Sequence, residues 1–227
     1  MPRKSSQPSS SSTDPKKTVL IVDDHPVFRA GLSGLVNLEP DLSVCGEAQD
    51  GAATLAFLEK RMPDVVLMDM SLLGKSGLDL IKDLRAIYPS VKVLVISMHD
   101  ERLYAERVIR SGGRGYIMKQ EGPEKVIAAI RKVLSGGIAV SEQTASHLLD
   151  VMAGTHAIHS SLAALSDREL DVYRLLGSGV EPHEIARKLH LSIKTVDTHR
   201  LNIRRKLGLR NATELVHHAT RWAAGQA

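Results

Sequence analysis

The segment Val65-Val66-Leu67-Met68-Asp69-Met70 indicates how the first half of the chain folds. A short apolar run that ends in one carboxylate predicts a strand buried on both faces, which carries a charged group to the edge of a sheet. Four further runs share this design, and each is followed by polar residues: 19–22 before Asp23 and Asp24, 42–46 before Glu47, 91–96 before Ser97, and 114–118 before Lys119.

Helical patterns alternate with these runs, at 26–37, 51–60, 76–87, 101–111 and 122–135. Because parallel strands need crossover connections, this alternation predicts a parallel sheet with helices on both faces. The expected fold class is α/β: a five-strand doubly wound parallel sheet of the flavodoxin-like order 2-1-3-4-5, followed by a small all-α domain of four helices.

Length and composition indicate a globular protein with two domains. The chain has 227 residues, of which 43% are hydrophobic and 25% are charged, and a domain takes roughly 100–200 residues. The single cysteine, Cys45, excludes an internal disulfide and favours a reducing compartment. No apolar run approaches the ~18 residues of a membrane span, and the N-terminus lacks the apolar core of a signal peptide. We therefore expect a cytoplasmic protein with no membrane partner.

The chain divides into four predicted segments. Residues 1–16 are Ser/Pro-rich and predict a disordered tail. Residues 17–138 form the α/β domain, 139–161 the linker, and 162–227 the all-α domain. From Ser160 onward eleven Lys and Arg face seven acidic residues, so the last third carries all of the net charge of +4. This distribution favours nucleic-acid binding by the C-terminal domain.

The ends of strands 1 and 3 gather acidic residues. In the order 2-1-3-4-5 a ligand lies beyond the carboxyl ends of these two strands, where Asp23, Asp24 and Asp69 stand. Crowded carboxylates favour a cation, and hard oxygen ligands suit Mg²⁺. Ser97 and Lys119 end the neighbouring strands and add a hydroxyl and a positive charge. This set of groups predicts a phosphoryl group held covalently on a carboxylate.

Residues 18–135 resemble the receiver domain of bacterial two-component response regulators, on the strength of Asp23-Asp24, Asp69, Gly77, Ser97, and Tyr116 with Lys119. The resemblance implies that Asp69 accepts phosphate from a sensor histidine kinase. It also implies that Asp24, Asp69 and the main-chain carbonyl of Ser71 bind Mg²⁺, with Asp23 acting through water. Lys119 would pair with the phosphoryl oxygens, while Ser97 and Tyr116 change position as the switch. Receivers usually carry proline where this chain has Leu73, and many carry proline where it has Gln120.

The last 66 residues contain helical patterns and no strand signal. Ser166-x-x-Glu169 is a capping box that starts a helix to about Leu176, and a second helix follows over 181–189. Ser192 is the predicted N-cap of a third helix, and Asn211 caps a fourth. Two short helices joined by a tight turn predict a helix-turn-helix, whose second helix enters the major groove.

The third helix divides into a core face and a DNA face. Val196, His199, Ile203 and Leu207 follow helical spacing toward the core. The predicted DNA contacts are the residues that project away or are basic: Lys194, Thr195, Thr198, Arg200, Leu201, Arg204, Arg205 and Lys206.

This domain closely resembles the LuxR-type helix-turn-helix through Leu165-Ser166-Asp167-Arg168-Glu169, Lys194-Thr195-Val196-Asp197-Thr198-His199 and Arg205-Lys206-Leu207. The whole chain thus resembles a NarL/FixJ-family response regulator. The resemblance implies a transcription regulator, not an enzyme, in which phosphorylation of Asp69 relieves a restraint and promotes homodimers on a palindromic DNA operator. Its implied partners are a sensor histidine kinase, double-stranded DNA and RNA polymerase. Leu215, Val216, Ala219 and Trp222 form a stripe that either makes a dimer face or closes the small core.

Two alternatives stay open from the residues alone. The first is a phosphatase or phosphotransferase that uses Asp69 as nucleophile, but such enzymes place a second acid where this chain has Ser71. The second is a phosphorylation-independent DNA binder that keeps the receiver as a dimerisation module.

Overall fold

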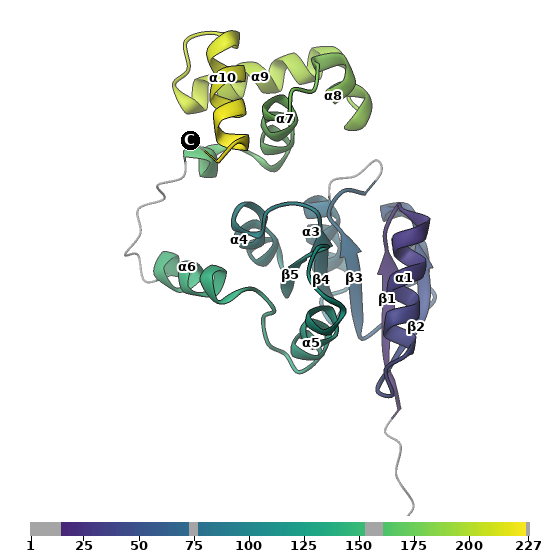
Figure 1. Ribbon diagram of the computed structural model, residues 1–227. Coiled ribbons are helices and arrows are strands. Elements are labelled where there is room, and N and C mark those ends of the chain that lie inside the picture. Colours follow the sequence, from purple (N-terminus) through teal and green to yellow (C-terminus); the bar gives the residue numbers. More distant parts are fainter. Residues whose placement is uncertain (1–14, 73–76, 153–160, 226–227) are drawn as a thin grey trace, which may run out of the picture.

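A computed structural model describes residues 15–72, 77–152 and 161–225 (Figure 1). Most of the predicted tail, and Leu73, lie outside these residues. The first domain is built on five strands: β1 (Lys17–Val22), β2 (Leu42–Ala48), β3 (Val65–Asp69), β4 (Lys92–Ser97) and β5 (Gly115–Met118). They are parallel and lie in the order β2-β1-β3-β4-β5. The predicted fold class is confirmed.

Helices cover both faces of this sheet because its strands are apolar on both sides. One face packs against α1 (Pro26–Asn37) and α5 (Pro123–Leu134). The other packs against α2 (Gly51–Leu58), α3 (Gly77–Ile87) and α4 (Glu101–Ser111). This double cover leaves the carboxyl ends of the strands as the place where polar side chains gather.

Part of the predicted linker is ordered against the first domain. Ala139 pairs with Gly115 beside β5 and is buried. The helix α6 (Glu142–Met152) follows and contacts α4, and the Ser141 main-chain N donates to Glu101 Oε1 at 2.7 Å. Residues 153–160 of the linker lie outside the described part of the chain.

The second domain consists of a short 3₁₀ turn η1 (Ser161–Ala164) and the helices α7 (Asp167–Gly177), α8 (Pro182–Lys188), α9 (Ile193–Leu207) and α10 (Ala212–Ala223). The predicted capping box is present. The Ser166 side chain accepts a hydrogen bond from the main-chain N–H of Glu169, and the Glu169 side chain accepts one from the main-chain N–H of Ser166. Ser192 and Asn211 cap α9 and α10 as predicted.

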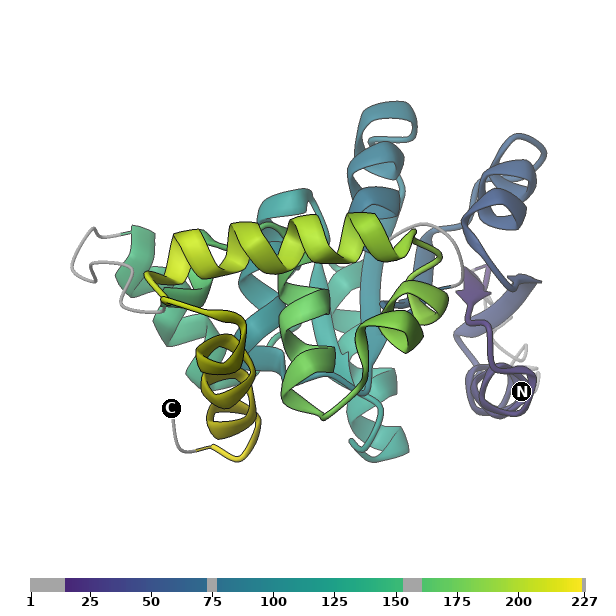
Figure 2. The ribbon, with the colours of Figure 1, turned by 90° about the horizontal axis from the view of Figure 1, so that it is seen from above.

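A core of buried residues from α7, α9 and α10 fixes the orientation of α9. Val196 and Ile203 are fully buried on α9, and Leu215 and Ala219 are fully buried on α10. His199 and Leu207, also predicted inward, are only partly buried. Figure 2 shows α9 lying across the side of this domain that faces away from the sheet.

Among the described residues, no helix combines the length and the apolar character that a bilayer crossing requires.

Candidate functional site

The carboxyl ends of β1, β3 and β5 meet at one cluster of charged groups. Asp23 follows β1, Asp69 ends β3, and Lys119 follows β5. Lys119 Nζ donates to Asp23 Oδ2 at 2.7 Å and to Asp69 Oδ2 at 2.8 Å. The side chains of Asp23, Asp69 and Lys119 are 0%, 3% and 6% exposed, so these charges face each other with little screening by water. The structure thus brings together three residues predicted from strand ends.

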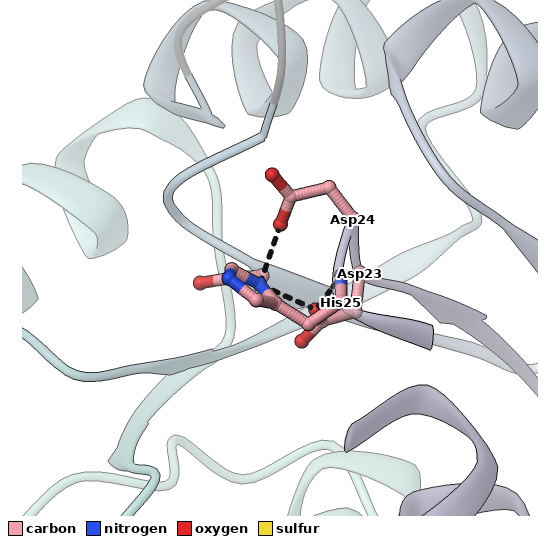
Figure 3. Close-up of side chains that lie close together, drawn as sticks. Asp23, Asp24 and His25 are labelled. Atoms are coloured by element: carbon pink, nitrogen blue, oxygen red, sulfur yellow. Dashed lines mark hydrogen bonds and ion pairs between the residues drawn. The ribbon is translucent and has the colours of Figure 1, made fainter. Parts of the chain in front are cut away.

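Asp24 points into the same cluster but is less well paired. Its Oδ1 is buried and accepts no hydrogen bond, although His25 Nδ1 lies 2.8 Å away (Figure 3). The ligand atoms of Asp23, Asp24, His25 and Asp69 all lie within 4.8 Å of one another. A buried carboxylate oxygen that accepts no hydrogen bond, beside two further carboxylates, fits a hard divalent cation such as Mg²⁺. His25 was not singled out in the sequence, where its only signal is its place after Asp23-Asp24.

Burial and Lys119 act in opposite directions on the acidity of Asp69. Burial raises the pKa of Asp69, and the hydrogen bond from Lys119 lowers it without cancelling the rise. Burial also lowers the pKa of Lys119, but the hydrogen bonds to Asp23 and Asp69 outweigh this effect and raise it. Lys119 is therefore a permanent cation that links the two carboxylates.

The predicted switch residues both contact the main chain of His99. Ser97 is buried, and its Oγ accepts from the His99 main-chain N at 3.2 Å. The buried Tyr116 donates its hydroxyl to the His99 carbonyl at 2.9 Å. Ser71 donates its main-chain N–H to Asp69 Oδ1 at 3.2 Å, and its Oγ lies 2.9 Å from His99 Nε2. His99 therefore joins both switch residues to the loop after Asp69.

His99 carries no charge at neutral pH. Burial, and then the positive charges of Arg174 and Lys119, lower its pKa to about 4. Arg174 belongs to the C-terminal domain, so the environment of His99 already depends on that domain. The sequence offered no signal for this, because Arg174 lies 75 residues further along the chain.

The predicted DNA contacts on α9 differ in how exposed they are and in whether they are already paired. Lys194, Thr198, Leu201, Arg205 and Lys206 are exposed, whereas Thr195, Arg200 and Arg204 are partly buried. Three of the cations are engaged within the domain: Lys206 Nζ with Glu169 Oε2 at 2.6 Å, Arg200 Nη1 with Asp197 Oδ1 at 2.8 Å, and Arg204 Nη2 with the Arg210 carbonyl at 2.7 Å. Lys194 and Arg205 are the α9 cations most available to phosphates.

The stripe on α10 divides between the core and the surface. Leu215 and Ala219 are fully buried, and Trp222 packs against Tyr173 with ring centroids 5.4 Å apart. Val216 is 39% exposed. Core closure therefore accounts for most of the stripe, and Val216 is the member available for contact with a second copy.

Two protein families match this chain, one in each of its two domains. Residues 19–131 match the response regulator receiver domain, and residues 163–219 match bacterial regulatory proteins of the luxR family. The oxygen regulatory protein NreC of Staphylococcus carnosus is 33% identical over 207 residues, covering 88% of this chain and 95% of NreC. NreC of Staphylococcus aureus is 35% identical with the same coverage.

Solved structures show the same arrangement of domains along the chain. The RcsB response regulator of Salmonella typhimurium superposes with a TM-score of 0.67 at 28% identity, covering 90% of this chain and 97% of that one. RcsB from Salmonella enterica serovar Typhimurium, bound to a promoter in the presence of the phosphomimetic BeF3-, gives a TM-score of 0.65 at 27% identity, covering 91% and 99%. Such relatedness along the full length, together with the receiver and luxR-type matches, shows that the chain belongs to the NarL/FixJ family of two-component response regulators and carries a LuxR-type DNA-binding domain.

Proposed function

We propose that Asp69 is the phosphoacceptor and that its phosphorylation controls DNA binding by α9. The observation that carries this proposal is the Lys119 ammonium, which donates to both Asp69 and Asp23 in a cluster that also holds the Asp24 carboxylate. An Asp69 oxygen bonds to the phosphorus of a kinase phosphohistidine as the P–N bond breaks and the imidazole leaves with the electron pair. Lys119 then pairs with phosphoryl oxygens instead of with the carboxylate alone.

Mg²⁺ would be held by Asp24, Asp69 and the carbonyl of Ser71, with Asp23 acting through water. When bound, it supplies positive charge that neutralises the phosphoryl oxygens. Ser97 and Tyr116 act as the switch, because each already contacts His99, and a hydroxyl that turns to the phosphoryl group releases the His99 main chain.

The DNA contacts proposed are those of the outward face of α9. Lys194, Thr195 and Thr198 lie in its N-terminal half, which recognition helices present to base edges, and Leu201 follows just past its midpoint on the same exposed face. Arg200, Arg204, Arg205 and Lys206 serve phosphates. Solved structures show RcsB, a relative, with DNA and as dimers bound to DNA. By analogy, this chain acts in the cytoplasm as a homodimer on a palindromic operator, with a sensor histidine kinase upstream and RNA polymerase downstream, and it does not turn over external substrates.

The test measures molar mass and binding to nonspecific duplex DNA at one stated salt concentration, with and without Mg²⁺ and beryllofluoride. Wild type should shift to a dimer and bind DNA more tightly with the phosphoryl mimic, whereas Asp69→Asn should fold normally but show neither change. Continued labelling of Asp69→Asn by a small phosphodonor would contradict the assignment of the acceptor.

One observation favours a second candidate, a DNA binder that needs no phosphorylation. The predicted contacts Lys194, Thr198, Leu201 and Arg205 are exposed while the two domains are in contact. Equal DNA affinity of wild type with and without the mimic would establish this candidate in place of the first.

A further inference from the structure

An arginine of the receiver, Arg107, makes three hydrogen bonds to the start of the C-terminal domain. Arg107 on α4 donates through Nη1 to the Leu165 carbonyl and to Asp167 Oδ1, both at 2.9 Å, and through Nη2 to the Leu162 carbonyl at 3.0 Å. Lys82 on α3 donates to Asp167 Oδ2 at 2.9 Å. We call these contacts of Arg107 and Lys82 with Leu162, Leu165 and Asp167 the Arg107 clamp.

The clamp is partly shielded from water, which distinguishes it from an ordinary surface ion pair. The side chains of Arg107 and Asp167 are 18% and 23% exposed, and Leu162 and Leu165 are buried. A planar guanidinium that donates to three acceptors loses less entropy per hydrogen bond than a flexible lysine does. The two carbonyls also belong to the turn that precedes the Ser166 cap, so Arg107 holds the beginning of α7.

The clamp leaves the DNA-binding surface open. Its C-terminal contacts come from η1, α7 and the residues between them, whereas α9 lies on the side of the domain that faces away from the sheet (Figure 2). The receiver therefore does not cover the recognition helix in this arrangement. The clamp instead restricts the position and orientation of the C-terminal domain. This restriction matters because the two recognition helices of a dimer must reach half-sites about 34 Å apart to bind a palindrome.

A second contact connects this interface to the phosphorylation site. The His99 ring packs against Tyr104 of α4 with centroids 5.3 Å apart. The Tyr104 hydroxyl donates to Asp171 Oδ1 of α7 at 3.4 Å, and Tyr104 itself is 1% exposed. His99 is also the residue that Ser97 and Tyr116 contact. A movement of the His99 main chain can therefore reach α7 through the buried Tyr104.

We infer that the Arg107 clamp holds the C-terminal domain on the receiver by its α7 cap, and that the His99–Tyr104–Asp171 contact makes this docking depend on the phosphorylation site. The inference rests on the proposed function for its trigger, but the docking itself is independent of it. Phosphorylation would thus free the orientation of an already exposed α9, without uncovering it.

The experiment uses the full chain without phosphodonor and compares Arg107→Ala with Arg110→Ala. Both arginines lie on α4, but Arg110 pairs with Glu106 on its own helix, so the second variant matches the change in charge and size. Docking is measured by the radius of gyration in small-angle scattering and by hydrogen exchange of the segment 161–171. Arg107→Ala should expand the protein and speed exchange in this segment by about tenfold or more, because three hydrogen bonds from a charged group are lost. Arg110→Ala should match wild type.

Circular dichroism checks that both variants keep wild-type helix content, and Arg107→Lys provides a second variant that keeps the charge. The lysine should give intermediate exchange, since it keeps the positive charge near Asp167 but lacks the planar set of donors that binds Asp167 and the two carbonyls. Wild-type scattering and exchange in both Arg107 variants would overturn the clamp.

The coupling is tested with Tyr104→Phe, which keeps the ring against His99 and loses the contacts of the hydroxyl with Asp171 and Arg174 of α7. The variant should remain docked, but beryllofluoride should release its C-terminal domain less than it releases that of wild type. Release equal to wild type would overturn the coupling. If beryllofluoride fails to release wild type while Arg107→Ala is undocked, the clamp stands and the proposed phosphorylation switch fails, so the two failures are distinguishable.

Discussion

Replacing Glu169 by Gln tests whether a buried charge attaches α9 to α7. Glu169 Oε2 accepts from the Ser166 main-chain N at 2.7 Å and from Lys206 Nζ at 2.6 Å, and its side chain is 5% exposed. The glutamine oxygen can still accept the hydrogen bond from the Ser166 main-chain N–H, but it carries no negative charge to pair with Lys206. A hydrogen bond to a charged group contributes roughly 1.5–3 kcal/mol. Because Lys206 is 38% exposed, water screens the pair, and we expect a loss of about 1 kcal/mol.

Glu169→Ala should cost more, since it also leaves the Ser166 N–H without its acceptor, at about 1–3 kcal/mol in addition. The pH dependence provides a second signature. Burial raises the pKa of Glu169, but the hydrogen bonds from Lys206 and Ser166 outweigh it and lower the pKa. The ionised form is therefore favoured in the folded state. Its contribution is complete above the unfolded pKa of about 4.3 and is lost as pH falls through the lowered value.

The assay is hydrogen exchange of the amides in α7 and α9 in the full chain, which reports the free energy of opening of this domain alone. Glu184→Gln is the matched control, because Glu184 pairs with Arg187 at 3.0 Å while the two side chains are 41% and 76% exposed. That exposed pair should contribute less than about 0.5 kcal/mol. If Glu169→Gln and Glu184→Gln shift exchange equally, the reasoning from burial is refuted.

Three further outcomes are expected. Gly177→Ala should destabilise the C-terminal domain by about 1–3 kcal/mol in denaturant unfolding, because a Cβ there would lie 2.5 Å from the Ala219 carbonyl oxygen; wild-type stability would contradict this close approach of α7 and α10. Arg205→Ala should weaken nonspecific DNA binding and lower the slope of log affinity against log salt by about 1, and an unchanged slope would remove Arg205 from the phosphate contacts. Burial raises the pKa of Asp64, but the hydrogen bonds from Thr18 outweigh burial and lower it, so the stabilisation of the fold by the ionised carboxylate should disappear as pH falls below about 4. Asp64→Asn should therefore flatten acid unfolding curves measured by circular dichroism. Curves like those of wild type would show that these hydrogen bonds do not depend on the charge.

Much of the fold and the receiver site could be predicted because both depend on local patterns. Each apolar run, such as Val65–Asp69, is long enough for a strand and ends in a polar residue, and parallel strands bring their ends to one edge. Helix starts were equally predictable, since Ser166, Ser192 and Asn211 cap helices through contacts three residues away.

Residues whose roles depend on distant partners could not be predicted in this way. In the sequence, His99 lies shortly after the predicted strand 91–96 and Arg107 lies within the predicted helix 101–111, and neither position indicates a partner. Their contacts, to Ser97 and Tyr116 and to Leu162, Leu165 and Asp167, join segments separated by up to 60 residues. The pairing of Lys206 with Glu169, 37 residues earlier, was likewise not predictable, because the sequence indicates only that Lys206 is a basic residue on the third helix.

The order of the elements, the residues at the strand ends and the caps of the helices follow from local sequence, because hydrophobic period and capping chemistry act over a few residues. Which charges meet across the chain depends on the packing of distant segments: Lys119 contacts Asp23 and Asp69, and Arg107 contacts the start of α7. Such contacts depend on how helices pack on a sheet and how two domains meet. A one-dimensional pattern carries no record of those distances, whereas the energy of a buried charge depends on them directly.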